Sequence, residues 1–263
     1  MDLGLKGRVA IVTGSSRGIG KAIARGLAEE GARVTICARN ETELARAAEE
    51  IASSTNTEVL PVRADLRSRV DINRLVEATI SRFGRIDILV NNTGGPPPLL
   101  FLETREEHWH DAFEQLFMSI VNCCYAVIPY MRQQRWGRII NMTSFAAKQP
   151  AENLILSNAI RAGILGLTKS LSNELAEYGI LVNAVCPGWT LTERVEELAR
   201  ANAERTGRSI NDVLNEWASR IPLKRLAKPE EIANLVVFLA SERASYITGA
   251  VIQVDGGFIK SII

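Results

Sequence analysis

Several side chains between residues 144 and 161 have types and spacing that could donate a hydrogen bond to a carbonyl group, relay a proton or bind a charged substrate. Ser144 follows a short apolar run, and Ser157 stands four residues before Arg161. A spacing of four places two residues on one face of a helix, so Ser157 and Arg161 should act together. A serine hydroxyl donates a hydrogen bond but is a poor proton donor at neutral pH, whereas an arginine keeps its positive charge. Lys148 lies four residues after Ser144, and it either relays a proton or binds a charged substrate, or is a solvated loop charge. Glu152 carries the same pair of interpretations.

Hydrolysis and metal chemistry are poorly supported by the rest of the chain. The two histidines, His108 and His110, bracket Trp109 at the start of a predicted helix and have no partner at a metal-ligand spacing. Ser144 as a nucleophile would need a nearby histidine base, and neither histidine falls in a suitable register. The sequence therefore predicts no metal site and disfavours a serine hydrolase.

A glycine-rich turn near the N-terminus is the second feature with a chemical reading. The run 8–13 is predicted as a strand, the run 21–30 as a helix, and the turn between them reads Thr13-Gly14-Ser15-Ser16-Arg17-Gly18-Ile19-Gly20. Glycines allow a tight turn and a close approach of the backbone to a pyrophosphate, and the helix N-terminus offers unpaired N–H groups to the anion. The context after a strand and before a helix predicts a dinucleotide-binding turn.

The residues after the second predicted strand favour one dinucleotide over the other. An acidic residue there would hydrogen-bond the ribose hydroxyls of NAD, but the chain has Ala38 followed by Arg39. Arg17 lies nearby in the glycine-rich turn. Two guanidiniums without a competing carboxylate suit a 2′-phosphate, so NADP(H) is preferred over NAD(H).

Short apolar runs alternate with longer helical patterns along the whole chain. The predicted strands cover residues 8–13, 33–38, 58–63, 86–91, 137–142, 180–186 and 250–254. The predicted helices include residues 21–30, 41–53, 70–83, 106–131, 156–175 and 229–240. Most of these runs are apolar throughout, as in strands that are buried on both faces of a parallel sheet. The alternation predicts an α/β fold with a doubly wound parallel sheet of the Rossmann type.

We expect a single domain over residues 1–263, because no low-complexity linker divides the chain. Residues 190–223 interrupt the alternation with a charged, helix-prone segment that is longer than a plain connection requires. Because it follows the strand 180–186, it is interpreted as a substrate lid. A solvated helical hairpin at a subunit contact is the alternative.

Composition and charge narrow the class of partner. Lys and Arg number 31 against 30 Asp and Glu, the net charge is +1, and the basic residues are scattered. This distribution argues against a nucleic-acid or anionic-membrane partner. No signal peptide and no apolar run of membrane-spanning length is expected. The four cysteines, Cys37, Cys123, Cys124 and Cys186, have no C-x-x-C spacing and are interpreted as reduced core thiols of a cytoplasmic protein.

Taken together, these residues make the chain resemble the short-chain dehydrogenase/reductase family, and in particular its β-ketoacyl carrier-protein reductase-like branch. The resemblance covers nearly the whole length and rests on residues 13–20, Asp65-Leu66, 91–94, 137–144, Pro187-Gly188, Thr192 and 255–257. It implies that Asp65 and Leu66 meet the adenine, and that Asn91, Thr93 and Gly94 support the cofactor. It also implies that Pro187, Gly188 and Thr192 flank the nicotinamide.

The catalytic set of the family, Asn, Ser, Tyr and Lys, is only partly present. Ser144 matches the serine, but Ser157 stands at the tyrosine position and Arg161 at the lysine position. Registered on Trp109 and residues 126–131, Leu116 falls at the asparagine position. Thr93 replaces the usual alanine.

Two functions stay open at this point. The first is an NADP(H)-dependent oxidoreductase that interconverts a small-molecule carbonyl and an alcohol through a modified proton relay. The second is a catalytically silent dinucleotide-binding protein, a sensor or a structural subunit. Leu116 and Trp189 are expected to line part of the pocket. The resemblance further implies a homotetramer in which helices 106–131 and 156–175 pair across subunits.

Overall fold

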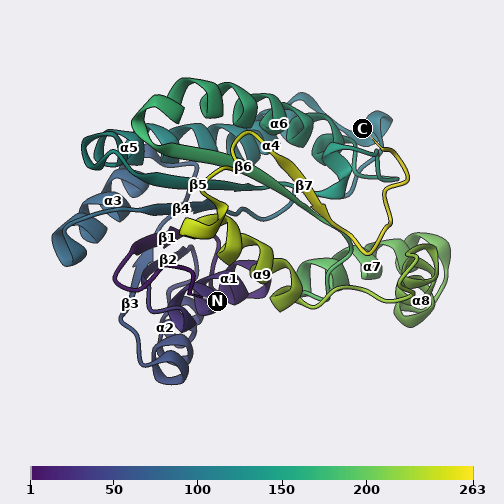
Figure 1. Cartoon of the computed structure of the whole chain (residues 1–263). Helices are drawn as coiled ribbons and strands as arrows, with labels where there is room; N and C mark the ends of the chain where they lie inside the picture. Colours follow the sequence, from purple (N-terminus) through teal and green to yellow (C-terminus); the bar gives the residue numbers. More distant parts are fainter. Residues whose placement is uncertain (1, 263) are drawn as a thin grey trace.

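A seven-stranded parallel sheet forms the centre of the molecule in the computed structural model, which describes residues 2–262 (Figure 1). The strands are β1 (Val9–Val12), β2 (Arg33–Ala38), β3 (Val59–Arg63), β4 (Ile88–Asn91), β5 (Gly137–Met142), β6 (Ile180–Pro187) and β7 (Val251–Val254). Their order in the sheet is β3-β2-β1-β4-β5-β6-β7. The expected doubly wound, Rossmann-type α/β fold is confirmed.

Helices cover both faces of the sheet. They are α1 (Gly18–Glu29), α2 (Glu41–Thr55), α3 (Arg69–Phe83), α4 (Glu106–Phe113), α5 (Ser119–Gln134), α6 (Ile155–Leu175), α7 (Glu193–Thr206), α8 (Ile210–Arg220) and α9 (Pro229–Ala240). Helices α1, α2 and α9 lie on one face, and α3, α5 and α6 lie on the other (Figure 1). The structure also contains short 3-10 turns and a π-helical turn, η2 (Glu114–Met118), between α4 and α5.

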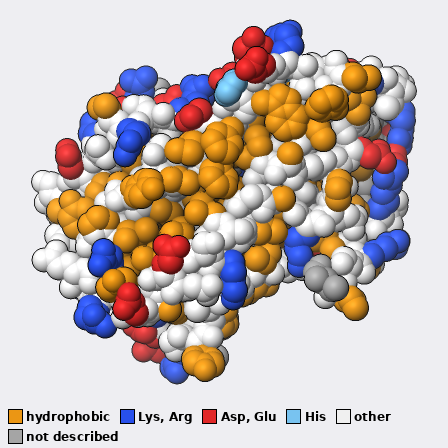
Figure 2. Space-filling view, turned by 90° about the horizontal axis from the view of Figure 1, so that it is seen from above, with side chains coloured by type: hydrophobic (Ala, Val, Ile, Leu, Met, Phe, Trp, Pro, Cys, Tyr) orange, Lys and Arg blue, Asp and Glu red, His pale blue; other side chains and the backbone are white. Residues whose placement is uncertain are grey.

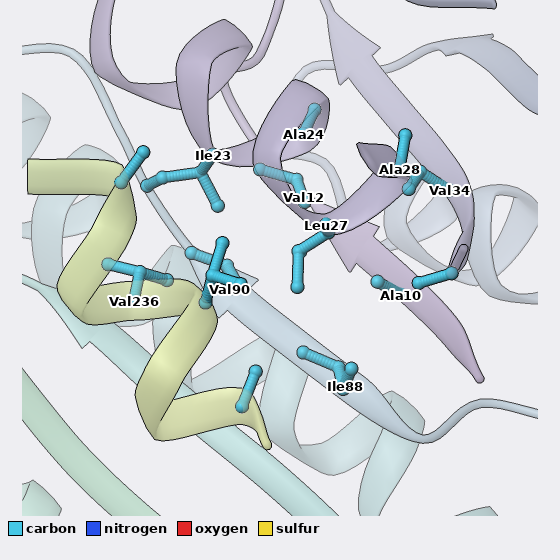
Figure 3. Close-up of a cluster of buried hydrophobic side chains, with 14 of the residues drawn as sticks. Ala10, Val12, Ile23, Ala24, Leu27, Ala28, Val34, Ile88, Val90 and Val236 are labelled. Carbon is cyan, nitrogen blue, oxygen red and sulfur yellow. The ribbon is translucent and has the colours of Figure 1, made fainter. Parts of the chain in front are cut away.

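The larger part of the core lies between the sheet and helices α1 and α9. Figure 3 shows Ile23 and Leu27 of α1 and Val236 of α9 directed toward Val12 and Val90 of the central strands. These side chains are fully buried. Burial of a Leu, Ile or Val side chain contributes roughly 1.5–3 kcal/mol each, so this layer anchors the strands from which the functional loops leave.

The strand and helix boundaries agree closely with the sequence pattern. Strands β2 and β5 and helix α9 have the expected bounds, and the other strands differ by one or two residues at an end. Every residue of β1, β4 and β5 is buried, because these strands are covered on both faces. An apolar run was therefore sufficient to locate them.

One expectation about apolar segments needs correction. The continuous helical stretch Glu106–Gln134 is 29 residues long and has a mean hydropathy of 1.3 in its most apolar window, so by length and composition it passes as a membrane-spanning helix. In the fold it is a core element: Ile120, Val127 and Met131 are buried against the sheet and its neighbours. Its apolar character follows from that position.

Residues 190–223 form a helical hairpin of α7 and α8 that stands away from the main layers (Figure 1). The two helices have a small core of their own, in which Ala199 and Val213 are fully buried. Trp189 and Trp217 stack with ring centroids 4.1 Å apart and join the hairpin to the end of β6.

Asp87, fully buried before β4, holds the start of the central strands together. Its carboxylate accepts hydrogen bonds from Val9 N at 2.9 Å, from Arg8 at 3.1 Å and from Arg85 at 2.6 Å. We expect Asp87→Ala to lower the free energy of unfolding by roughly 3 kcal/mol, because it leaves the buried Val9 N–H and the Arg85 guanidinium without their acceptor, while Arg8 keeps its bond to Glu242. Urea unfolding measures the loss, with the exposed Glu77→Ala as control. Equal midpoints for the two variants would contradict this role.

Candidate functional site

The candidate site lies at the carboxyl ends of the parallel strands, where the strand order reverses. Chain connections run outward from β1 to β2 on one side, and β4 pairs with β1 on the other. Loops that leave β1 and β4 in opposite directions open a crevice at this point, which is where open α/β sheets bind ligands. The glycine-rich turn follows β1 and borders that crevice.

The glycine-rich turn is folded tightly against the end of β4. A Cβ atom on Gly20 would lie 2.3 Å from the Gly14 carbonyl oxygen, and one on Gly14 would lie 2.6 Å from the Asn92 carbonyl oxygen. The Asn92 side chain donates to the carbonyl oxygens of Thr13 at 3.2 Å and Gly14 at 2.9 Å. Side chains are excluded from this turn, so its backbone can approach a bound phosphate.

Two connected chambers open from the turn. The first, which we call the Asp65 chamber, has a volume of about 420 Å³. The second, the Ser157 chamber, has a volume of about 340 Å³. Residues shared by both linings show that they join: Gly14, Arg17, Arg39, Thr93, Gly94 and Gln115.

The Asp65 chamber has a basic rim. Arg17 and Arg39 line it, and Ala38 provides no carboxylate at the end of β2. Asp65 also lines the chamber, and its carboxylate accepts from the Arg67 guanidinium at 2.7 Å. That hydrogen bond lowers the pKa of Asp65 from its ordinary value. The chamber therefore offers two guanidiniums to an anionic group.

Arg161 projects from α6 to a wall of the Ser157 chamber. Its Nη1 donates to the carbonyl oxygens of Met142 at 3.3 Å and Thr143 at 3.1 Å, and its Nη2 donates to Gly94 O at 3.2 Å. Burial, followed by repulsion from Arg194, lowers the pKa of Arg161 to about 10. Arg161 is therefore still a cation at neutral pH, and it fastens α6 to the ends of β4 and β5.

Ser144 and Ser157 line the same chamber as Arg161. Ser144 Oγ accepts a hydrogen bond from Ala146 N at 3.1 Å, which leaves its own proton available to a ligand. Ser157 is 6% exposed, and within residues 2–262 its hydroxyl makes no hydrogen bond. The hydroxyls of Ser144 and Ser157 and the guanidinium of Arg161 thus border one cavity, an arrangement that can stabilise an oxygen atom that becomes negatively charged.

A thiol lies directly behind this wall. Cys186 Sγ is 3.0 Å from Thr143 Oγ1, and both side chains are buried. Burial raises the pKa of the Cys186 thiol above its ordinary value. Cys186 is therefore held as a neutral thiol and is a poor nucleophile. The other three cysteines are likewise free and buried.

Most of the residues selected from the sequence line one of the two chambers. Those at the Asp65 chamber are Gly14, Ser16, Arg17, Arg39, Asp65, Leu66, Thr93 and Gly94. Those at the Ser157 chamber include Gly18, Ile19, Gly20, Ser144, Ser157, Arg161, Pro187, Gly188 and Thr192. Segments that are far apart in the chain are thus assembled around one crevice.

A few selected residues lie elsewhere. Lys148 Nζ donates to Gln253 Oε1 at 2.9 Å and is outside both linings, and Glu152 borders a neighbouring cavity of about 290 Å³. Asn91 is buried below the crevice, where its amide donates to Asn141 Oδ1 at 2.9 Å. Among residues 2–262, no group of three His, Cys, Asp or Glu side chains is placed to hold a metal ion.

The position of Leu116 contradicts one prediction made from the sequence. It was expected to line the pocket, but it is fully buried in a cluster with Leu156 and Ile160. The residue of this helix that borders both chambers is Gln115, which lies in the π-helical turn η2. Trp189 does line the Ser157 chamber, as expected. Sequence reasoning missed both Gln115 and Arg194.

The residues around the crevice fit a dinucleotide. The glycine-rich turn leaves no room for a side chain beside the N-terminus of α1, and Gly188 approaches Asp255 so closely that a Cβ would lie 2.7 Å from its Cα. Arg17 and Arg39 lie where the two chambers join, and of the two chambers the hydroxyl donors Ser144 and Ser157 line only the second. A long ligand with phosphates in its middle matches this distribution.

Comparison with known proteins agrees with this geometry. The sequence profile of the family described as enoyl-(acyl carrier protein) reductase matches residues 14–259. The 3-oxoacyl-[acyl-carrier-protein] reductase FabG of Staphylococcus epidermidis is 36% identical over 248 residues, which cover 94% of this chain and 97% of the relative. The FabG protein of Aquifex aeolicus is 37% identical over 257 residues, which cover 98% and 99%.

Two solved structures are similar over nearly their whole length. L-sorbose reductase from Gluconobacter frateurii, complexed with NADPH and L-sorbose, has a TM-score of 0.95, 37% identity and full coverage of both chains. An actinorhodin polyketide ketoreductase with NADPH has a TM-score of 0.93 and 34% identity, and the match covers 97% of this chain and 98% of that one. From its sequence and its fold alike, this chain belongs to the short-chain dehydrogenase/reductase family, in the β-ketoacyl carrier-protein reductase-like branch.

Proposed function

We propose that the protein is an NADP(H)-dependent oxidoreductase that interconverts a small-molecule carbonyl and an alcohol. The observation that carries this proposal is the grouping of Ser144, Ser157 and Arg161 on one chamber that opens from the glycine-rich turn. The NADPH complexes of L-sorbose reductase and of the polyketide ketoreductase support the choice of cofactor and of reaction class. The reaction takes place in the Ser157 chamber.

When bound, the cofactor supplies the hydride that converts a carbonyl carbon to an alcohol carbon. The hydroxyls of Ser144 and Ser157 donate hydrogen bonds to the carbonyl oxygen, which becomes negatively charged as the hydride arrives. Arg161 contributes a fixed positive charge to the same wall and holds the nicotinamide ribose hydroxyls. A serine is too weak an acid to protonate the oxygen efficiently, so the proton comes from water through the hydroxyls. Lys148, which is bonded to Gln253, takes part only if its side chain turns toward Ser144.

The remaining cofactor contacts are proposed from the family resemblance, and the chamber linings support them. Asp65 and Leu66 contact the adenine, and the glycine-rich turn with Arg17 contacts the phosphates. Asn91 supports the cofactor indirectly, because it is buried beneath the crevice at the end of β4 and bonds to Asn141. Thr93 and Gly94 border the cofactor itself. Pro187, Gly188 and Thr192 flank the nicotinamide.

Arg39 is expected to select NADPH. Arg39→Ala should weaken NADPH binding by roughly 10- to 100-fold and leave NADH binding nearly unchanged, because it removes a charge-assisted bond to the 2′-phosphate. Nicotinamide fluorescence titration of the purified protein measures both dissociation constants. The exposed Arg69→Ala, on the neighbouring helix α3, is the matched control. Equal losses for NADPH and NADH in Arg39→Ala would contradict the assignment.

The same titration tests the function as a whole. Tight binding of NADPH, followed by NADPH oxidation with at least one member of a carbonyl panel, is the expected result. If neither NADPH nor NADH binds, the oxidoreductase proposal fails.

We assign the hairpin 190–223 to a substrate lid. Its first helix, α7, supplies Arg194, Val195, Glu197 and Leu198 to the Ser157 chamber, so movement of the hairpin would open that chamber to solvent. Arg17 and Glu197 form an ion pair at 3.7 Å that links the glycine-rich turn to α7.

A homotetramer in the cytoplasm is the proposed form of the protein. Figure 2 shows apolar side chains gathered on the face that carries α4, α5 and α6. Phe113 of α4 and Tyr125 of α5 are 43% and 66% exposed. An apolar face of this kind suits pairing with other subunits. The four buried free thiols suit a reducing compartment.

One observation favours a second candidate, a catalytically silent dinucleotide-binding protein. The resemblance to the family registers Ser157 and Arg161 with its tyrosine and lysine, and the linear register places Leu116 at its asparagine. Such a protein would bind NADPH tightly and oxidise it with no carbonyl compound.

A further inference from the structure

Two arginines from different helices hold the same loop beside the Ser157 chamber. Arg161 of α6 donates to Gly94 O at 3.2 Å, and Arg194, in the first turn of α7, donates to Pro96 O. A Cβ atom on Gly95 would lie 2.9 Å from Arg194 Nε and from its Nη2, so the guanidinium lies against the backbone of this glycine. Both arginines line the chamber that contains Ser144 and Ser157.

These two guanidiniums have little negative charge around them. Among residues 2–262, Arg161 has no carboxylate partner, and Arg194 has one, Glu197, at 3.5 Å. Glu197 is shared with Arg17, whose guanidinium lies 3.7 Å away. The chamber wall around Arg161 and Arg194 therefore carries a surplus of positive charge.

Without an anion in the chamber, burial and mutual repulsion make the charged forms of these two guanidiniums less favourable. The Arg194 side chain is 33% exposed and Arg161 is 7% exposed, so both charges have lost much of their hydration. Burial lowers the pKa of Arg194, and repulsion from Arg194 contributes to the lowered pKa of Arg161. An anion placed between them would offset both effects.

The contacts of Arg194 distinguish it from the guanidiniums of the Asp65 chamber. Arg17 and Arg39 line both chambers, whereas Arg194 lines the Ser157 chamber and not the Asp65 chamber, bonds to Pro96 O and shares its lining with the two serines. We propose that Arg194 binds a carboxylate of the substrate, so that the substrate is a carbonyl compound with a carboxylate close to its reacting carbon. This inference rests on the proposed carbonyl–alcohol function, since it places the carboxylate in the chamber of the reacting group.

The test uses unreactive probes that carry a carboxylate near a carbonyl group. Oxamate and malonamate differ by one carbon between the two groups, and the methyl ester of each is the uncharged match. Calorimetric titration of the whole protein, with and without saturating NADPH, gives their dissociation constants. We expect at least one acid to bind tenfold or more tightly than its ester.

Variants assign the preference to Arg194. Arg194→Gln should weaken binding of the preferred acid at least tenfold and leave the ester unchanged, whereas Arg194→Lys should keep most of the preference because the charge remains. Arg200→Gln, on an exposed part of the same helix, should behave as the unaltered protein. The NADPH dissociation constant should change less than threefold in all three variants.

Three results would overturn the inference. In the first, neither acid binds better than its ester, with or without NADPH. In the second, Arg194→Gln keeps the preference for the acid. In the third, Arg194→Gln weakens NADPH binding instead, which would assign Arg194 to the cofactor phosphates. If the unaltered protein binds no NADPH or reduces no carbonyl compound, the proposed function fails, but the inference about Arg194 does not fail with it. The titrations of the acids and esters without NADPH would then test Arg194 alone.

Discussion

Ser157→Tyr combined with Arg161→Lys is expected to raise the rate of carbonyl reduction by NADPH on the order of 10²- to 10⁴-fold, the usual contribution of a positioned general acid. A phenol has a pKa near 10, and a lysine ammonium one helical turn away would lower it further. The serine hydroxyl of the natural chain has no comparable acidity. Single-turnover oxidation of NADPH, with the best substrate from a carbonyl panel, measures the gain.

The structure indicates that the double variant can fold. Ser157 lies on the wall of a chamber of about 340 Å³, so a larger side chain has space on that side. A lysine at position 161 keeps a positive charge on the wall where Arg161 now contacts the carbonyl oxygens of Met142, Thr143 and Gly94. Its ammonium offers three donors, although without the planar fork of the guanidinium.

A matched control distinguishes the effect of the tyrosine hydroxyl proton from the effect of the larger aromatic ring. Ser157→Phe with Arg161→Lys has the ring and the lysine but lacks the hydroxyl. We expect this control to remain at or below the rate of the unaltered protein. If the two double variants bind NADPH equally and reduce carbonyls equally slowly, the chamber serves another purpose, and the catalytically silent alternative gains support.

Arg161→Met is expected to lower the turnover number on the order of 10²- to 10³-fold, the effect of removing one donor from a site of developing negative charge. The substitution removes the cation that lies on α6 and takes from three carbonyl oxygens the donor that Arg161 supplies. We also expect the free energy of unfolding to fall by roughly 1–3 kcal/mol, since two of these backbone acceptors, those of Met142 and Thr143, lie at buried positions. Steady-state kinetics and urea unfolding measure the two effects separately.

The controls for this variant lie on the same helix. Lys169→Met removes a cation from the exposed side of α6 and should change neither quantity. Arg161→Lys keeps the charge, so it should recover part of the lost turnover. If Arg161→Met leaves both the turnover number and NADPH binding unchanged, Arg161 has no role in the mechanism.

Local sequence patterns were sufficient to locate the strands and the turn that support the candidate site. The apolar runs of β1, β4 and β5 located these strands because both of their faces are buried, so each residue of the run contributes to the pattern. The glycine-rich turn was equally readable. Gly14 and Gly20 lie where any Cβ would collide with the backbone, and that requirement is visible in the residue type itself.

The asparagine position shows where a linear register is misleading. Alignment on flanking residues placed Leu116 at the pocket, but the π-helical turn Glu114–Met118 adds backbone to the helix and changes which side chain faces the crevice. Gln115 borders both chambers, and Leu116 turns into a buried apolar cluster. A helical wheel with a regular period cannot reveal such a turn.

The amino-acid sequence by itself determined the sheet and the dinucleotide-binding turn, because these depend on residue type and on short spacings. Only the tertiary structure decided which long side chains reach the chambers. Lys148, close to Ser144 in the chain, bonds to Gln253, whereas Arg194, 33 residues after Arg161, shares its wall. The end of a long, flexible side chain goes where distant segments offer acceptors and space, and those segments meet only after the chain has folded.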